Sequence, residues 1–117
     1  GDVRGDHGVM ATAKPETRLR QSIAKAIRRR GHIVYTLHGS ALAAPGRPDL
    51  IVCVLGRFAA IEVKTRRGEA SDYQLREIKL LRDHGAYVAI VRSLEEAEDF
   101  IDRITAVEEM RRIGGIQ

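Results

Sequence analysis

Apolar and polar positions along the chain predict three helices and four strands. Apolar side chains recur at helical spacing in the helices, whereas the strands are short apolar runs between glycine, proline or polar residues. The expected helices cover residues 15–30, 71–84 and 93 onward, and the expected strands cover residues 32–37, 50–55, 58–63 and 86–91. This order predicts an α/β domain in which a mixed sheet lies between helices.

The two central strands are joined by Gly56 and Arg57, which predict a type II′ hairpin turn because glycine comes first. In that register Asp49 lies opposite Lys64. Because side chains alternate between the two faces of a strand, Asp49, Glu62 and Lys64 then project from one face. Acids in an apolar setting need partners, and Mg²⁺ or Mn²⁺ is a natural one because these ions prefer carboxylate oxygens.

A glutamate stands in the first turn of the first expected helix. At about 100° per residue, Glu16 falls on the same apolar stripe as Ile23 and Ile27. Two explanations stay open for this carboxylate. It can be favoured by the positive end of the helix dipole, or it can belong to the acidic face of the hairpin.

The composition indicates one globular domain with a basic body. The 117 residues are 44% apolar and 31% charged, with a formal net charge of +4. Residues 1–93 hold 17 Lys and Arg against 9 Asp and Glu, whereas residues 94–117 hold 3 against 7. This asymmetry favours a polyanionic partner, although a merely solubilised surface explains the charge equally well.

Several classes of protein are disfavoured by the sequence. Cys53 is the single cysteine, so no internal disulfide can form, and its apolar strand predicts a buried thiol. No apolar run is long enough for a membrane span, and no signal peptide opens the chain, so a cytoplasmic protein is expected. The spacing of Cys and His does not suggest zinc, and no glycine-rich loop suggests a nucleotide cofactor. Residues 1–14 are expected to be a flexible segment preceding a single domain of residues 15–117.

The residues around the hairpin resemble a known nuclease pattern. Pro48-Asp49 and Glu62-Val63-Lys64 resemble the PD-(D/E)XK nuclease superfamily, and more narrowly the virus-type replication-repair nuclease (VRR-NUC) domain. The corresponding motifs in chain order are Glu16, Gly46-Arg47-Pro48-Asp49, Glu62-Val63-Lys64 and Ser71-Asp72-Tyr73-Gln74. The resemblance covers about residues 15–93 and implies a restriction-endonuclease-like core to which the last helix is an addition.

The resemblance implies a Mg²⁺- or Mn²⁺-dependent deoxyribonuclease that acts on DNA in replication, repair or recombination. Its implied catalytic residues are Glu16, Asp49, Glu62, Lys64 and Gln74. Its implied metal ligands are Asp49, Glu62, the backbone carbonyl of Val63, and Glu16 either directly or through water. Gln74 has a second explanation, because Ser71 and Gln74 also form a capping-box pattern at the start of a helix. A phage-encoded protein acting in the bacterial cytoplasm would suit this family.

DNA is the expected partner, as a duplex, flap or junction. The candidate phosphate contacts are Arg18, Arg47, Arg66, Arg67 and Lys79. His38 could serve as a general base, but its place in a loop favours an ordinary surface histidine.

A homodimer is expected because a chain of this size carries one site and a duplex has two strands. The stripe formed by Phe100, Ile104, Val107 and Met110 could supply the contact or could instead cover the sheet. Two other functions remain open: a nucleic-acid-binding module with the same fold but no catalysis, and a domain that binds another protein through its acidic last helix.

Overall fold

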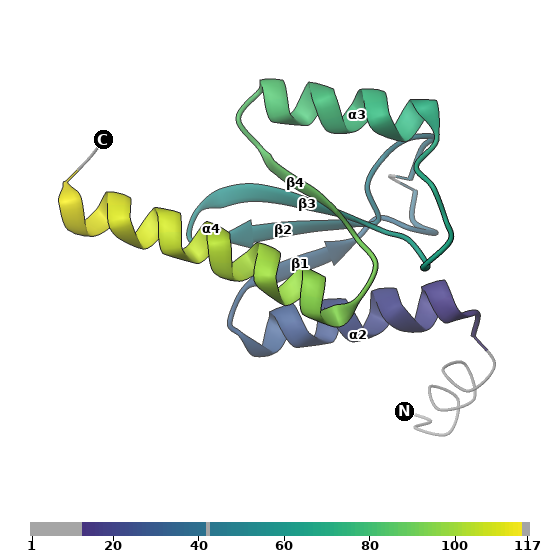
Figure 1. Cartoon of the computed structure of the whole chain (residues 1–117), viewed down its shortest axis with the longest axis horizontal. Helices are drawn as coiled ribbons and strands as arrows, with labels where there is room; N and C mark the ends of the chain where they lie inside the picture. The colour runs from purple at the N-terminus through teal and green to yellow at the C-terminus, as the bar shows by residue number, and fades with distance from the viewer. Residues whose placement is uncertain (1–12, 42, 116–117) are drawn as a thin grey trace.

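The computed structural model describes residues 13–41 and 43–115, and the helices and strands follow the predicted order (Figure 1). The elements are α2 (Pro15–Arg29), β1 (Ile33–Thr36), β2 (Leu50–Val54), β3 (Arg57–Val63), α3 (Asp72–Asp83), β4 (Tyr87–Val91) and α4 (Leu94–Gly114). The predicted boundaries differ from these by one residue at most. Apart from its last two residues, the segment predicted to be flexible, residues 1–14, lies outside the described residues.

The strands form one mixed sheet in the order β1-β2-β3-β4. β1 and β2 are antiparallel, as are β2 and β3, whereas β3 and β4 are parallel. A parallel pair cannot be joined by a tight turn, and α3 accordingly provides the crossover between β3 and β4. The fold class is therefore α/β with a mixed sheet, as the sequence predicts.

The β2–β3 hairpin turns one residue earlier than the sequence predicts. Val54 pairs with Arg57, so the turn residues are Leu55 and Gly56. Both have positive φ, 49° and 80°, which is the signature of a type I′ turn. The type II′ prediction was wrong because a type I′ turn also matches the twist of the strands, and Gly56 suits its second left-handed position.

This correction shifts the register by two residues and therefore leaves every side chain on its predicted face. Leu50 pairs with Ile61, and one further step along the ladder brings Asp49 opposite Glu62 rather than Lys64. The prediction that the two acids share a face of the hairpin does not depend on which two-residue turn closes it.

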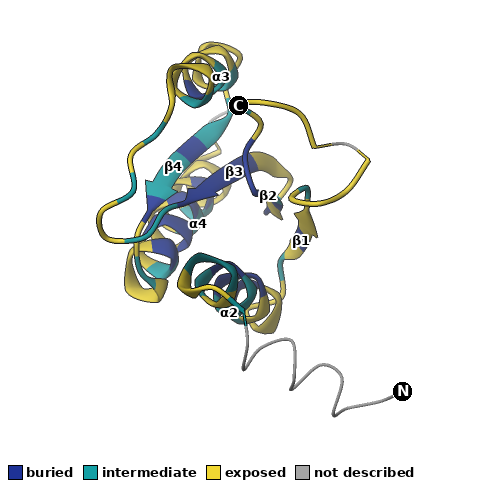
Figure 2. Ribbon diagram, turned by 90° about the vertical axis from the view of Figure 1, so that its right-hand side faces the viewer, coloured by how far each residue is buried: buried dark blue, intermediate teal, exposed yellow. Residues whose placement is uncertain are grey.

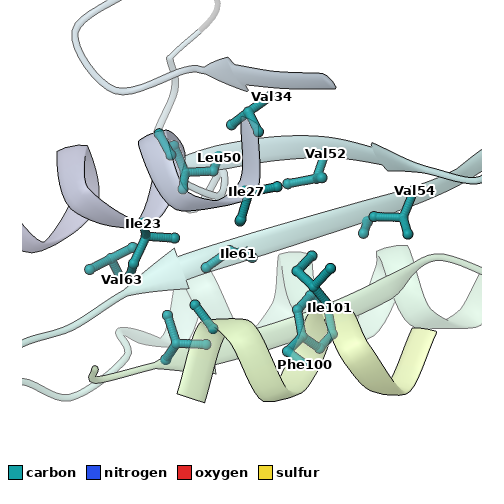
Figure 3. Close-up of a cluster of buried hydrophobic side chains, with 14 of the residues drawn as sticks. Ile23, Ile27, Val34, Leu50, Val52, Val54, Ile61, Val63, Phe100 and Ile101 are labelled. Carbon is teal, nitrogen blue, oxygen red and sulfur yellow. The ribbon is translucent and has the colours of Figure 1, made fainter. Parts of the chain in front are cut away.

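One face of the sheet is covered by α2 and α4, which also contact each other. Figure 3 shows the main core, where Ile23 and Ile27 of α2 and Ile101 of α4 meet side chains of β2 and β3. These three isoleucines are at most 1% exposed. Burying side chains of this size stabilises the fold by about 1.5–3 kcal/mol each. This packing holds α2 and α4 against the strands whose ends carry the charged residues.

The opposite face is covered by α3 over one half of the sheet (Figure 2). Ile78 of α3 packs with Ala60 and Val88, whereas Tyr35 of β1 is 65% exposed. Cys53 lies in the uncovered half and is exposed, so the prediction of a buried thiol was wrong. Its strand is apolar, but the helix that would bury this face lies over β3 and β4 instead.

The buried side of α4 differs in part from the predicted stripe. Phe100 and Ile104 are buried, which fits the second of the two roles left open for the stripe, but Val107 is 41% exposed and Met110 is 71% exposed. The end of α4 extends past the sheet (Figure 1), and at the level of Val107 the buried side of the helix is taken by Glu108.

Glu108 occupies the buried side of α4 at this end of the sheet. It accepts hydrogen bonds from Arg57 Nε at 2.9 Å and from the Tyr87 hydroxyl at 3.0 Å, and Arg111 Nε lies 3.6 Å away. These partners lower the pKa of Glu108, with the hydrogen bond from Arg57 as the main cause. A fully partnered carboxylate of this kind ties α4 to β3 and β4.

Among the described helices, none combines the length and the apolar character that crossing a membrane requires.

Candidate active site

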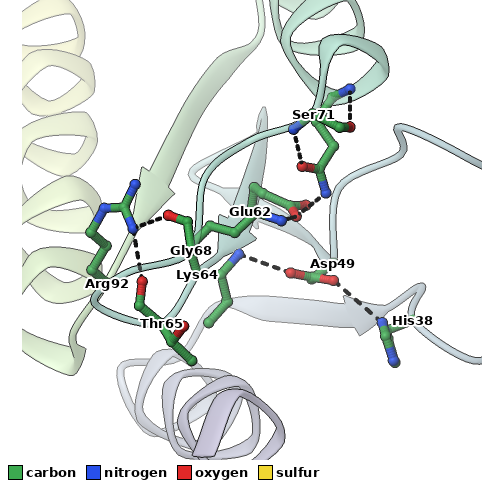
Figure 4. A network of polar contacts seen from close by, with 10 residues as sticks. His38, Asp49, Glu62, Lys64, Thr65, Gly68, Ser71 and Arg92 are labelled. Atoms are coloured by element: carbon green, nitrogen blue, oxygen red, sulfur yellow. Dashed lines mark hydrogen bonds and ion pairs between the residues drawn. The ribbon is translucent and has the colours of Figure 1, made fainter.

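Three charged side chains converge where β2 begins and β3 ends (Figure 4). Asp49 is 7% exposed and Glu62 is 3% exposed. Asp49 Oδ2 accepts a hydrogen bond from the backbone N–H of Val63 at 2.8 Å, and Lys64 Nζ lies 3.3 Å from Glu62 Oε2. The structure therefore brings together Asp49, Glu62 and Lys64, the residues on which the sequence interpretation depended.

Gln74 joins this group from the first turn of α3. Ser71 Oγ accepts a hydrogen bond from the backbone N–H of Gln74 at 3.2 Å, and Gln74 Oε1 accepts one from the backbone N–H of Ser71 at 2.8 Å. The same side chain donates through Nε2 to Glu62 Oε2. The capping box is thus confirmed, and the same amide also contacts the acid, so the two explanations of Gln74 are compatible.

These residues line a cavity of about 220 Å³ at the end of the sheet. Its charged and polar lining residues are Glu16, His38, Arg47, Asp49, Glu62, Lys64 and Gln74. Glu16 comes from the first turn of α2, and its charge contributes to the raised pKa of Glu62. The helical stripe therefore placed Glu16 correctly beside the acidic face.

His38 has a closer relation to the site than its loop position suggests. Its Nδ1 lies 3.5 Å from Asp49 Oδ1, although the side chain is 54% exposed. The loop after β1 is held in place because the backbone N–H of Leu37 donates to the carbonyl of Asp49 at 2.8 Å. The sequence carried one signal for this contact, namely that the His38 loop leads directly to Asp49.

The pKa of Glu62 is raised from 4.5 to about 7. Burial is the largest cause because it removes water from the carboxylate, and the negative charge of Asp49 adds to it. Lys64 opposes this rise but does not cancel it. Glu62 Oε1 is also buried without a hydrogen-bond partner. The carboxylate is therefore costly to ionise in this position and has one oxygen free to bind a cation.

A hard divalent cation suits this donor set. Asp49 and Glu62 supply carboxylate oxygens, and a cation between them would relieve both their repulsion and the unpaired Glu62 Oε1. In residues 13–41 and 43–115, no three His, Cys, Asp or Glu side chains are close enough to share one ion. An ion here would thus take few side-chain ligands and complete its shell with backbone or water oxygens, as Mg²⁺ commonly does.

The predicted phosphate contacts lie at different distances from the cavity. Arg47 lines it, whereas Arg18, Arg66, Arg67 and Lys79 are exposed and lie outside its lining. Lys79 also forms an ion pair with Asp83 at 2.7 Å.

Arg92 has a positioning role that the sequence did not reveal. Its Nη1 donates to the carbonyl of Thr65 at 2.7 Å and to the carbonyl of Gly68 (Figure 4). The basic turn that carries Arg66 and Arg67 is thus fixed to the end of β4.

Known protein families and solved structures include proteins that are similar to this chain. Residues 15–95 match the VRR-NUC domain family. A solved structure described as a VRR-NUC domain is similar with a TM-score of 0.62 and 28% sequence identity, over 77% of this chain and 97% of that chain. Hjc from Archaeoglobus fulgidus, described as a Holliday junction resolvase, gives a TM-score of 0.46 and 24% identity over 63% of this chain and 66% of its own. No curated protein matches the chain. Because the family match spans most of the chain and contains each of the site motifs, this protein belongs to the VRR-NUC family of nuclease domains.

Proposed function

We propose that this protein is a Mg²⁺- or Mn²⁺-dependent DNA endonuclease that hydrolyses phosphodiester bonds in structured or branched DNA. The observation that carries the proposal is Glu62, a buried carboxylate with an unpaired oxygen beside a second carboxylate and a lysine. Membership of a nuclease domain family supports the activity. The preference for flaps or junctions rests on the family resemblance.

In this proposal Asp49 and Glu62 hold the ion directly. The backbone carbonyl of Val63 is a further ligand, and Glu16 acts through water because no three acidic or His side chains of the described residues converge closely enough. When bound, such an ion supplies a water of lowered pKa and neutralises charge on the phosphate. Gln74 keeps Glu62 oriented through its hydrogen bond to Oε2.

Lys64 provides the positive charge at the reacting phosphate. Its ammonium group lies beside Glu62, where it can orient the attacking water and stabilise the negative charge that develops on the phosphoryl group. Arg47 contacts the phosphate at the cavity, while Arg18, Arg66, Arg67 and Lys79 hold the DNA backbone further away. These backbone contacts position the substrate without reading its sequence.

A homodimer completes the proposal, since one site per chain is suited to cutting one strand. The surface predicted for the contact was the α4 stripe, but Phe100 and Ile104 of that stripe pack against the sheet. The alternative prediction, that the stripe covers the sheet, therefore holds for its first half.

The test is cleavage of labelled duplex, flap and four-way-junction DNA of matched sequence, with Mg²⁺, Mn²⁺ or EDTA. Cleavage that requires the divalent ion and is fastest on a branched substrate is expected. Tight binding of the same substrates without cleavage in either metal would overturn the proposal in favour of a non-catalytic nucleic-acid-binding module.

A further inference from the structure

Buried polar atoms without partners mark two neighbouring places in this protein. Within residues 13–41 and 43–115, three buried side-chain nitrogen or oxygen atoms have no hydrogen-bond partner: Glu62 Oε1, Arg20 Nη1 and Gln21 Oε1. Such atoms are uncommon because leaving them unpaired costs free energy, so each one needs an explanation. Glu62 lies in the proposed metal site. The other two belong to a different cavity.

Arg20 and Gln21 line a cavity of about 270 Å³ between α2 and the end of β1. Its other lining residues are Ala24, Arg28, Thr36 and His38. Arg20, Ala24 and Arg28 recur every four residues and so share one face of the helix. None of the described residues that line this cavity is acidic, and two of them are arginines.

Arg20 is unusual among the basic residues of the chain. It is 6% exposed, and its one side-chain hydrogen bond within the described part of the chain is long, from Nη2 to Thr17 Oγ1 at 3.4 Å. Among the described residues no carboxylate forms an ion pair with its guanidinium, and its Nη1 has no hydrogen-bond partner. A buried guanidinium without a counter-charge destabilises a fold, so packing alone does not account for this residue.

We propose that this cavity binds a phosphate group of the DNA strand next to the bond that is cut. This inference rests on the proposed function, because it assigns the cavity to the same substrate. His38 lines both this cavity and the proposed metal site, so the two lie side by side. A strand whose scissile phosphate occupies the metal site can then place a flanking phosphate beside Arg20.

The chemistry of the lining suits a phosphate group. Guanidinium groups bind phosphate oxygens through paired N–H donors, and Arg20 has donors without partners. Arg28, which also lines the cavity, donates from Nη2 to the carbonyl of Val34 at 3.0 Å, and its guanidinium has further N–H donors. The Gln21 Nε2 amide group and the Thr36 hydroxyl can also donate, whereas Gln21 Oε1 is an acceptor that a phosphate does not satisfy.

The first test uses inorganic phosphate and the metal-free protein. Phosphate should raise the melting temperature of the wild type, and Arg20→Met should abolish this increase. Without phosphate, Arg20→Met should melt at or above the wild-type temperature because an unpaired buried charge has been removed. The matched control is Arg29→Met, which removes one exposed charge from the same helix and should keep the wild-type response.

A purely structural Arg20 would give the opposite pattern. Arg20→Met would then melt well below the wild type, and phosphate would stabilise both proteins equally; that result would overturn the inference. Arg28→Met provides a second variant at an exposed position. It should weaken the phosphate response, and it should lower the melting temperature only slightly, through the lost hydrogen bond to the Val34 carbonyl.

The second test uses DNA with a single neutral methylphosphonate at successive positions around the cut. For the wild type, one flanking position should slow cleavage by roughly tenfold or more, because a charged hydrogen bond is lost there. Arg20→Met should be insensitive at that position, whereas Arg29→Met should respond as the wild type does. Equal sensitivity of Arg20→Met and wild type would overturn the assignment to the DNA strand. If the wild type cleaves no DNA at all, the proposed function fails, while the phosphate melting test still decides whether the cavity binds the anion.

Discussion

Neutralising Glu62 should stabilise the metal-free protein while removing its activity. The carboxylate is 3% exposed, lies near Asp49 and has an unpaired Oε1. Glu62→Gln keeps the size of the side chain and an oxygen that can accept from Gln74. It removes the charge that burial and Asp49 make unfavourable. Sites that gather like charges for catalysis commonly trade stability for function in this way.

The size of the effect follows from the pKa of Glu62, which is raised from 4.5 to about 7. Because the folded protein binds the proton more tightly than the unfolded chain, ionisation of Glu62 lowers the free energy of unfolding. No penalty applies below pH 4.5; it grows between pH 4.5 and 7 and is complete above pH 7. A shift of this size corresponds to about 3.5 kcal/mol at most, since one pKa unit is worth about 1.4 kcal/mol.

The measurement is thermal unfolding in EDTA at pH 5 and at pH 8. At pH 8, Glu62→Gln should melt above the wild type by roughly 4–12 °C, which corresponds to about 1–3 kcal/mol for a domain of this size. At pH 5 the difference in melting temperature should shrink to roughly a quarter of its value at pH 8, because Glu62 is then mostly protonated in the folded protein. Millimolar Mg²⁺ should stabilise the wild type by about 1 kcal/mol and the variant by less, because the variant has lost a ligand.

Glu108→Gln is the matched control for this prediction. Glu108 is also a buried glutamate, but its partners lower its pKa, so neutralising it should lower the melting temperature at pH 8. If Glu62→Gln instead melts below the wild type in EDTA and the wild type shows no shift with Mg²⁺, the converging-carboxylate account is wrong. Glu62 would then be a structural partner of Lys64.

Three other predictions follow from the site. Gly46→Ala should lower stability by about 1–3 kcal/mol and slow cleavage, because Gly46 has a φ of 86° and an added Cβ would lie 2.8 Å from the carbonyl oxygen of Tyr73. Gly39→Ala in the same loop has a φ of 76° but an open Cβ position, so it should cost less in a melting comparison. Calorimetry should show Mg²⁺ binding about tenfold more weakly at pH 6 than at pH 8, because protons compete for Glu62, whose pKa is about 7; equal affinities would contradict the ligand assignment. Sedimentation at micromolar concentration should show a dimer. A monomer would count against the proposal that two chains together cut the two strands of a duplex.

Local patterns in the sequence were enough to predict the elements and the grouping of the acids. Helix and strand boundaries follow from apolar periodicity and from residues such as Gly31. This glycine comes just after the end of α2 and has a positive φ of 92°. The shared face of Asp49 and Glu62 was predictable because strand side chains have a period of two. The turn type was not predictable, because Leu55 adopts a positive φ that leucine does not favour.

Burial depended on tertiary arrangement and was harder to predict. Cys53 is exposed because α3 covers the other half of its sheet face, and Val107 is exposed because Glu108 takes the buried side of α4 at this level. Arg20 is buried although basic residues in a helix usually reach solvent. The sequence offered one signal for this burial. Arg20 lies four residues after Glu16 and therefore falls on the face of α2 that meets the sheet. Contacts such as that between His38 and Asp49 join a loop to a strand and leave no periodic trace.

The central claim is that Asp49, Glu62 and Lys64 form a catalytic centre, and cleavage and DNA affinity measured together on Glu62→Ala and Lys64→Ala test it most directly. Each variant should lose cleavage of the best substrate while its affinity for that DNA is largely retained, because these side chains act on the transition state whereas distant phosphate contacts bind the ground state. Circular dichroism should first show that both variants are folded. Full cleavage by either folded variant would contradict the account.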